Sequence, residues 1–388
     1  MRDAGEKRPL LRSFFMGGFE CSTHINEHGR RLDLIDATRH DEFAERDYVR
    51  LLEHGIGTAR DGVRWHLIER EPYRYDFSSL ERQVRAVKKT GIQVIWDYFH
   101  YGFPDGLDIY SPEFVERFAG FSSTVTLFLK EELKQDPFVC PVNEISFFSW
   151  AAGDRGLFYP HSRRRGHMLK RQLVRAALAS VDAVRSAAPN ARWIFSDPAI
   201  HVVTRGTTTA AKRAAERYRR AQFEAYDMLA GRKDPDLGGH PRYIDIVGLN
   251  YYFHSQWFHP SRRKLPLGHK LYRPLNEILR EYYARYGRPV MIAETGIEDD
   301  ERPSWFRYVC EQSRIAMEHG VPLTGLCLYP ICNHPGWADN RHCHNGLWDY
   351  ADESGRRDIH QPLSDEIHRQ RSAFDRAGAA VKGAQNAC

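Results

Sequence analysis

The stretch IDIVGLN at residues 244–250 decides the fold, together with PVMIAET at residues 289–295. Both are short apolar runs that turn polar at the last position or two, which is typical of strands buried in a parallel sheet. Six further runs of this kind alternate with longer helical patterns along the chain. They are SFFMGGFE (13–20), GTARDGVRW (57–65), IQVIWDYF (92–99), FVCPVN (138–143), ARWIFSD (191–197) and LTGLCLYP (323–330).

The segments between these runs include amphipathic helices that end at a glycine. EFAERDYVRLLEHG (42–55) and SLERQVRAVKKTG (79–91) are two examples. Eight strands that alternate with helices predict an α/β fold, a single (β/α)8 TIM barrel with strands inside and helices outside. We expect a flexible N-terminus at 1–12, the barrel at 13–373 and a disordered tail at 374–388, because AGAAVKGAQNAC (377–388) lacks a core-facing pattern.

Composition and charge narrow the class of protein. The 388 residues carry a formal net charge of +5, and the arginine runs at 163–165 and 217–220 are short, so we expect no nucleic-acid partner. No stretch approaches about 18 uninterrupted apolar residues, and MRDAGEKRPLLRSFF (1–15) lacks the apolar centre of a signal peptide. We therefore expect a soluble, cytoplasmic protein with no membrane partner; the sequence leaves the oligomeric state open.

The seven cysteines show no paired spacing typical of a disulfide framework or a zinc ribbon, so we expect reduced thiols and neither a metal nor a cofactor. One loop leaves an alternative open, because it gathers several side chains that can bind metals. A loop that lines a pocket explains its polarity equally well, and its spacing fits no standard zinc pattern. Its residues are Cys332, His334, His342, Cys343 and His344.

The ends of the predicted strands indicate where the chemistry lies, because active sites of such barrels form at the carboxyl ends of the strands. Glu144 and Glu294 each follow an apolar strand, three strands apart in a closed barrel, so they roughly face each other. Each could instead be satisfied by an arginine in a structural ion pair. Two carboxyl groups that flank a glycosidic bond are the minimum apparatus for its hydrolysis, one as acid and one as nucleophile or base.

Other polar side chains at the strand ends suit this chemistry. Asn143 could bind a sugar 2-hydroxyl, and Arg60 would keep Glu294 ionised. A raised pKa at Glu144 would suit the acid. Further polar strand ends are at His100, Asn250 and Tyr252. Aromatic side chains at the same rim can stack on sugars or simply fill the core; they are Tyr101, Trp150, Tyr252, Trp257, Tyr329 and Trp337.

Five of these segments, taken in order, resemble the clan A glycoside hydrolases, and most of all family 1, the β-glucosidase family. ATRHDEFAERDYVRLLEHGIGTARDGVRW (37–65) resembles the segment that ends in the second strand and places the family's arginine at Arg60. DYFHYGFPDGL (97–107) is similar to the third-strand segment, with the sugar-binding histidine at His100. The resemblance covers almost the whole chain and implies a (β/α)8 barrel that acts on a glycoside.

The two glutamates lie in the remaining motifs. VNEISFF (142–148) resembles the Asn-Glu motif of strand four, which implies Asn143 and the acid/base Glu144, although the usual proline is replaced by Ile145. IDIVGLNYY (244–252) is similar to the sixth-strand motif, whose second tyrosine, Tyr252, contacts the nucleophile. PVMIAETG (289–296) resembles the segment that carries the nucleophile, which falls on Glu294.

The chain departs from the family pattern where the sugar is bound. His24 stands where the family has a glutamine. GLCLYPICNHPGWADN (325–340) keeps the final Trp337, but Gly336 replaces a glutamate that holds the outer hydroxyls of glucose, and Tyr329 replaces a tryptophan. Loss of hydrogen bonds to a charged acceptor costs about 1.5–3 kcal/mol each. We therefore expect a glycone, the transferred sugar, other than plain glucose, read by residues such as His24, His334 or Arg341.

The sequence therefore predicts a retaining β-glycosidase with a carbohydrate or glycoside as its partner. A transglycosidase would use the same carboxylates and pass the sugar to an acceptor hydroxyl instead of water. A catalytically silent barrel that binds carbohydrate is a second alternative, disfavoured because both Glu144 and Glu294 are present. A metabolic barrel that uses phosphate or a metal is a third, disfavoured because no clear glycine-rich phosphate loop follows the seventh or eighth strand.

Overall fold

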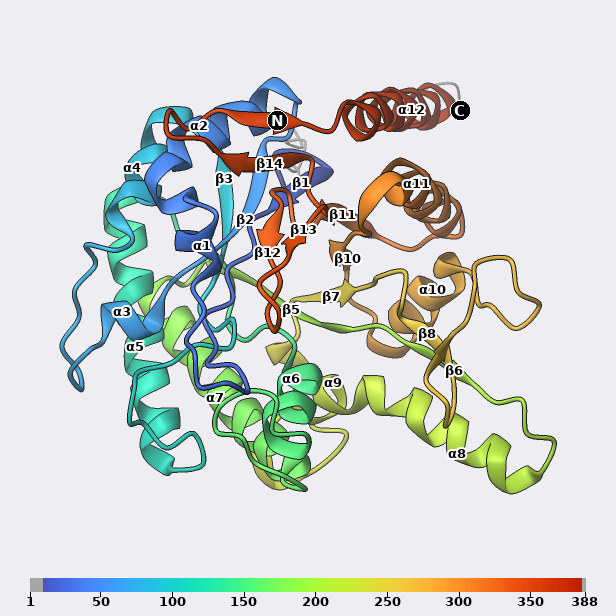
Figure 1. Ribbon diagram of the computed structural model, residues 1–388, viewed down its shortest axis with the longest axis horizontal. Coiled ribbons are helices and arrows are strands. Elements are labelled where there is room, and N and C mark those ends of the chain that lie inside the picture. Colours follow the sequence, from blue (N-terminus) through green and yellow to red (C-terminus); the bar gives the residue numbers. More distant parts are fainter. Residues whose placement is uncertain (1–9, 386–388) are drawn as a thin grey trace, which may run out of the picture.

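The computed structural model describes residues 10–385, and its centre is a closed barrel of parallel strands (Figure 1). Around the barrel the strands follow the order β1, β11, β10, β7, β5, β4, β3 and β2, and β2 returns to β1 to close it. The predicted (β/α)8 barrel is therefore confirmed. The strands are β1 (Phe15–Gly18), β2 (Thr58–Gly62), β3 (Gln93–Asp97), β4 (Phe138–Cys140), β5 (Arg192–Pro198), β7 (Ile246–Asn250), β10 (Val290–Thr295) and β11 (Leu323–Leu328).

All eight predicted strands are present, and most are shorter than their apolar runs. β1 and β2 are each four residues shorter than their runs, and β4 ends at Cys140 although its apolar run continues to Asn143. Pro141 follows directly and has no backbone N–H to donate, so the regular ladder stops there. Asn143 returns to the sheet in an isolated bridge with Ser196 of β5. Glu144 therefore lies in the loop after β4, four residues beyond the strand.

Helices surround the barrel on its outside (Figure 1). The two predicted helices with a glycine stop are α2 and α4, and Gly55 and Gly91 follow them with φ of 66° and 71°, values that glycine adopts without strain. The helices are α1 (Leu34–Ala37), α2 (His40–Glu53), α3 (Trp65–Ile68), α4 (Glu81–Thr90), α5 (Pro112–Leu133), α6 (Ile145–Phe148), α7 (Gly166–Ala187), α8 (Thr209–Arg220), α9 (Glu224–Leu229), α10 (Leu275–Tyr286), α11 (Arg302–Glu318) and α12 (Gln361–Gln385).

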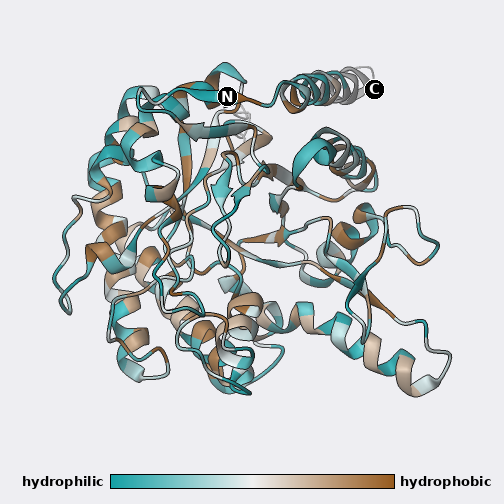
Figure 2. Cartoon of the chain, in the orientation of Figure 1, coloured by the Kyte–Doolittle hydropathy of each residue, from teal (hydrophilic) through white to brown (hydrophobic). Residues whose placement is uncertain are grey.

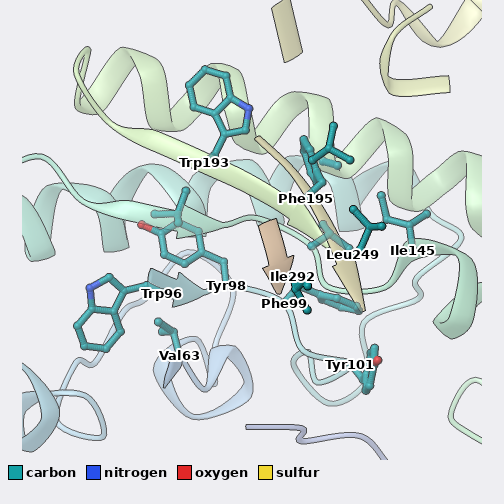
Figure 3. Packing of buried hydrophobic residues seen from close by; sticks show 14 of the residues in the cluster. Val63, Trp96, Tyr98, Phe99, Tyr101, Ile145, Trp193, Phe195, Leu249 and Ile292 are labelled. Atoms are coloured by element: carbon teal, nitrogen blue, oxygen red, sulfur yellow. The ribbon is translucent and has the colours of Figure 1, made fainter. Parts of the chain in front are cut away.

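Successive residues of a strand serve two different cores. In β3, Ile95 packs inside the barrel, whereas Trp96 packs outward in the large cluster between strands and helices. Trp193 and Phe195 of β5 do the same beside Ile194, and Figure 3 shows these outward side chains between the sheet and the helices. Figure 2 shows hydrophobic segments among the central strands and much hydrophilic colour on the helices at the periphery. None of the described helices is both long and apolar enough to cross a membrane.

Three small sheets lie in segments that follow barrel strands. The loop after β11 carries two hairpins, and the second of them lies beside α2 (Figure 1). The third sheet unites segments after β5 and β7 and lies beside the projecting helix α8. Their strands are β12 (His334–Pro335) with β13 (His342–Cys343), β14 (Trp348–Ala351) with β15 (Arg357–Ile359), and β6 (His201–Val203) with β8 (Gln256–Phe258) and β9 (Arg263–Lys264).

A buried charge network attaches β15 to the barrel. Arg357 of β15 donates to both carboxylate oxygens of Asp47 on α2, at 2.8 and 2.9 Å. His40 lies between that carboxylate and Asp61 of β2, with 2.9 Å to each. Burial alone would lower the pKa of His40, but the charge of Asp61 and the hydrogen bonds to both aspartates raise it to about 9. The network therefore joins three distant parts of the chain by charge.

The C-terminal segment differs from the expected disordered tail. Helix α12 continues past residue 374 to Gln385, and the alanine-rich sequence there favours a helix. Phe374 stacks on Phe14 with 4.6 Å between ring centroids and meets Phe15 edge to face, which ties this helix to the start of β1. In the expected N-terminal segment, Leu11 is buried against the barrel interior. Residues 1–9 and 386–388 lie outside the described residues.

Candidate active site

Glu294 lies near the carboxyl end of β10 and is paired with a cation. Its Oε1 accepts a hydrogen bond from Arg60 Nη1 at 2.8 Å, and its Oε2 accepts one from the Tyr252 hydroxyl at 2.8 Å. The side chain is almost completely buried. Burial raises the pKa of Glu294, while the positive charge of Arg60 acts in the opposite direction. Both contacts are the ones expected from the sequence for Arg60 and Tyr252.

Arg60 of β2 is the hub of the polar layer at this end of the barrel. Besides Glu294, it donates from Nε and Nη2 to the two oxygens of Asp97 at 3.0 and 2.7 Å. Its Nη2 also donates to Asn143 Oδ1 at 2.8 Å. The guanidinium is fully buried between these acceptors, so its planar fork fixes the side chains that surround it.

Glu144 has neutral partners only, which distinguishes it from Glu294. Tyr101 donates its hydroxyl proton to Oε2 at 2.5 Å, and Asn250 Nδ2 donates to Oε1 at 2.9 Å. No lysine or arginine of the described residues pairs with this carboxyl group. Burial and then the negative charge of Glu294 raise the pKa of Glu144. Burial thus raises the pKa of both carboxyl groups, but the charge of Arg60 opposes this rise at Glu294 alone, so Glu144 is the one that holds a proton more readily.

Glu144 and Tyr101 both adopt a backbone conformation that is rare outside glycine. Their φ angles are 49° and 73°, and the two side chains are bonded to each other. Such conformations cost about 1–3 kcal/mol and cluster at functional sites, where the surrounding structure holds them. Here the Glu144 backbone N–H donates to the carbonyl of Ser196 at 2.8 Å, which holds the glutamate against β5.

Asn143 and His100 connect the two glutamates. Asn143 Nδ2 donates to His100 Nε2 at 3.1 Å and to the Tyr101 hydroxyl at 3.2 Å, while its Oδ1 accepts from Arg60. His100 Nδ1 lies 3.0 Å from Asp97 Oδ2. One continuous hydrogen-bond network thus runs from Glu294 through Arg60 and Asn143 to Tyr101 and Glu144.

A small aromatic cluster adjoins this network and contains unsatisfied polar atoms. The His24 ring lies 5.1 Å from Trp337 and 6.1 Å from Tyr101, between ring centroids. Both ring nitrogens of His24 and Nε1 of Trp337 are buried without a hydrogen-bond partner among the described residues. Burial, helped by nearby His100 and Arg31, lowers the pKa of His24 to about 3, so its ring is neutral.

Two other predicted sugar-binding residues have different surroundings. The Tyr329 ring packs against Arg60, with 5.3 Å between the ring centroid and the guanidinium carbon. The absence of a side chain at Gly18 leaves space for this ring, because a Cβ there would lie 2.1 Å from it. His334 is partnered by the loop itself, since its Nδ1 faces the carbonyl of Pro335 and its Nε2 lies 3.0 Å from Asn345 Nδ2. The described contacts do not bring His334 together with the glutamates.

The site contains two residues that the sequence reasoning did not select as site residues. Tyr101 was expected only as an aromatic of the rim, but it bonds directly to Glu144. Glu20 follows β1 and is buried beside His100, with 3.9 Å between its Oε1 and His100 Nε2. A signal for Glu20 was available, because the first apolar run turns polar at this residue, as the others do at Glu144 and Glu294.

Two groups of described side chains could hold a metal ion by their spacing. The first consists of Cys21, Asp97 and His100. Arg60 already donates hydrogen bonds to Asp97. Burial and then the charge of Asp97 raise the pKa of the Cys21 thiol, which disfavours the thiolate that binds a metal. The second lies between the two hairpins that follow β11, since His342 belongs to β13 and Asp349 to β14, and it has a direct 2.7 Å contact between His342 Nε2 and Asp349 Oδ1. Its members are His342, His344 and Asp349, so the cysteines of the suspected loop are not part of it.

No family model and no curated protein matches the chain in sequence. Solved structures match in fold. A β-glucosidase from Thermotoga maritima in complex with glucoimidazole has a TM-score of 0.77 at 18% identity, covering 91% of this chain and 97% of that chain. An enzyme named AHE from Alicyclobacillus herbarius has a TM-score of 0.77 at 18% identity, with 93% and 98% covered.

A third structure is the virulence factor SghA with its substrate analogue salicin, with a TM-score of 0.75 at 18% identity and 93% and 96% of the two chains covered. These likenesses extend over nearly the whole of each chain, so no large part of either fold is missing from the other. The chain therefore has the (β/α)8 barrel fold of the family 1 β-glucosidases.

Proposed function

We propose that the protein is a retaining β-glycosidase in which Glu294 is the nucleophile and Glu144 is the general acid and base. The observation that supports this most is the contrast between the two glutamates. Glu294 faces the Arg60 guanidinium, which favours its ionised form, whereas Glu144 faces only neutral donors and has a raised pKa. An ionised attacking group and a protonated leaving-group acid are the two states that double displacement requires at its start.

The reaction has two steps in this proposal. First, Glu294 attacks the anomeric carbon while the glycosidic C–O bond breaks, and Glu144 gives its proton to the departing oxygen. The ester formed at Glu294 removes the negative charge that helps to raise the pKa of Glu144. Glu144 then ionises more readily, so it can take a proton from the water that attacks the glycosyl enzyme and frees Glu294.

The substrate in this proposal is a glycoside whose glycone differs from plain glucose. The loop after β11 supports this, because it has Gly336 where the resemblance places a glutamate that holds the outer hydroxyls of glucose, so that carboxylate is absent. The unpaired nitrogens of His24 and Trp337 are available to sugar hydroxyls instead.

We also propose a cytoplasmic location, since the six described cysteines are free thiols.

Replacement of the nucleophile tests the proposal. We expect Glu294→Gly to abolish hydrolysis of activated aryl β-glycosides, tried with several sugars, and azide to restore turnover with an α-glycosyl azide as product. Azide would attack from the face that Glu294 has left. Glu298→Gln is the control, because this partly exposed glutamate of the same loop pairs with Arg341 on the surface. Full activity of Glu294→Gly would refute the assignment.

The product analysis also separates the two alternatives. A transglycosidase would give mainly alkyl glycosides when an acceptor alcohol is added, at the expense of free sugar. A silent binding barrel would bind sugar equally well with or without Glu294 and turn over none of the glycosides. The first result would replace hydrolysis by transglycosylation in this proposal, and the second would replace it by sugar binding without catalysis.

A further inference from the structure

Glu20 is a third buried glutamate at the active-site end of the barrel. It follows β1 and is 7% exposed, and its Oε1 lies 3.9 Å from Nε2 of His100, which in turn is bonded to Asn143. Burial is the main cause of the raised pKa values of Tyr252 and Tyr329, and the negative charge of Glu20 adds to both. Its carboxylate thus belongs to the same electrostatic environment as Glu144 and Glu294.

The partners of Glu20 do not satisfy it. Its Oε1 accepts one hydrogen bond, from the backbone N–H of Ser22 at 3.0 Å, and the 3.9 Å to His100 is too long for a second. Among the described residues, no group donates to Oε2 and no lysine or arginine forms an ion pair with it. The guanidinium of the site, Arg60, is used by Asp97 and Glu294.

Two buried carboxylates elsewhere in the molecule are paired with cations, which offsets the cost of their desolvation, whereas Asp197 has no such pair and leaves one oxygen without a partner. Asp47 has Arg357 and Glu69 has Arg117, at 2.8 and 3.0 Å. An unpaired carboxylate persists when a ligand or ordered water supplies the missing donors. The unpaired nitrogens of His24 and Trp337 adjoin the same network through the contact of His24 with Tyr101, so this end of the barrel contains several polar atoms without a hydrogen-bond partner.

We propose that Glu20 determines specificity by accepting hydrogen bonds from hydroxyl groups of the glycone, and that the glycone is therefore neutral. A carboxylate accepts from two hydroxyls of one ring and repels a sugar that carries its own negative charge. The group nearest to Glu20 that can carry a positive charge is His100: burial would lower its pKa, but the hydrogen bond to Asp97 and the charge of Glu20 raise it, and both of these carboxylates already face it. The inference rests on the proposed function, since it deepens the description of the same site.

The test compares Glu20→Gln and Glu20→Asp with Glu27→Gln, a control at an exposed glutamate of the same loop. Activity is measured on aryl β-glucosides and β-galactosides, and on two anionic substrates, an aryl β-glucuronide and an aryl 6-phospho-β-glucoside. Binding of the neutral sugar mimic isofagomine lactam is measured by calorimetry. Thermal unfolding of each variant checks that it is folded.

We expect the wild-type enzyme to prefer the neutral substrates. Both Glu20 variants should lose about 10- to 100-fold in kcat/KM on them and about as much in affinity for the lactam, as hydrogen bonds to a charged group are worth this much. Glu20→Gln should also lower the preference for neutral over anionic sugars. The control should match the wild type in every measurement.

The possible results separate this inference from the proposed function. Turnover with no effect of either folded Glu20 variant would overturn the role of Glu20 and leave the proposed function standing. Absence of turnover, with lactam binding that still depends on Glu20, would overturn the proposed function and support the role of Glu20. A wild-type preference for the glucuronide or the phosphoglucoside would overturn the neutral glycone.

Discussion

The hydrogen bond from Tyr101 to Glu144 is the shortest of those described for the two glutamates. The hydroxyl of Tyr101 donates to the carboxyl group at 2.5 Å, and this hydrogen bond lowers the pKa of Glu144 against the larger upward effects of burial and Glu294. Tyr101 itself is held by Asn143 and by stacking on Phe148 at 5.4 Å between ring centroids. Tyr101 therefore limits how far the pKa of Glu144 rises.

Removal of this hydrogen bond should move the pH profile. In Tyr101→Phe the pKa of Glu144 rises further, so the acid stays protonated to higher pH and the alkaline limb of kcat/KM shifts upward by about one pH unit. The measurement is the pH dependence of kcat/KM on an aryl β-glycoside. Tyr73→Phe, at an exposed tyrosine, is the control. A downward shift in Tyr101→Phe would contradict the described contact.

The raised pKa of Glu144 also has a consequence for stability. A carboxyl group whose pKa is raised by folding contributes fully below its unfolded value of about 4.5, and this contribution is lost as pH rises through the folded pKa. Glu144→Gln has no such loss, so it should gain in Tm over the wild type from pH 5 to pH 9, by about 2 °C. Differential scanning calorimetry at several pH values measures this, and Glu298→Gln should show no gain. A Tm difference that is independent of pH would contradict the assignment.

At the scale of single residues, the sequence predicts that Glu144 and Glu294 lie together at the ends of the strands, and it misses some of the residues that contact them. Glu144 and Glu294 are predictable because a carboxylate directly after an apolar run is unusual and both occur in motifs. Tyr101 is not, since its contact with Glu144 depends on two residues with positive φ, which sequence patterns do not reveal. His334 was predicted to bind the sugar because it is a polar residue in a suitable loop, but its side chain is instead partnered by Asn345 of that loop.

Among the elements, the C-terminal hairpin of β14 and β15 depends on charge as well as on packing. Arg357 joins it to Asp47 of α2, and His40 extends the contact to Asp61 of β2. The arginine side chain is fully buried, so its loss leaves the negative charge of Asp47 less compensated inside the protein.

Replacement of Arg357 by a neutral residue should therefore destabilise the folded protein. We expect Arg357→Met to lower the free energy of unfolding by about 3–5 kcal/mol, as measured by urea denaturation. The adjacent Arg356→Met is the matched control, because Arg356 is largely exposed and its ion pairs contribute about 0–1 kcal/mol. If the two variants lost the same free energy of unfolding, the network would not stabilise the hairpin.

The elements of the barrel are largely predictable, because strands buried on both sides read as continuous apolar runs. Their ends depend on single residues, as Pro141 shows at β4. The sheet of β6, β8 and β9 was not predicted, since it joins short segments from separate loops with no continuous apolar run. Helix α12 was predicted to be disordered beyond residue 373, but Phe374 meets Phe14 and Phe15 from the other end of the chain.

In the whole molecule, the apolar side chains that fill the barrel and the charged side chains of the candidate site lie at different levels along the barrel axis. Apolar side chains such as Ile95, Ile194 and Met291 fill its interior, and the charged layer around Arg60 lies at the carboxyl ends of the strands. Parallel closure places the ends of β4 and β10 at the same face, which brings Glu144 and Glu294 to one site although they are far apart in sequence.

The central claim is that Glu294 becomes covalently attached to the sugar. Incubation with the 2-deoxy-2-fluoro analogue of the best aryl glycoside slows the second step more than the first, so the intermediate accumulates. Peptide mass spectrometry then identifies the labelled residue. The account predicts the sugar on the peptide that contains Glu294 and on no other; a label on Glu144 or Glu20, or turnover of the natural glycoside with inversion at the anomeric carbon, would contradict it.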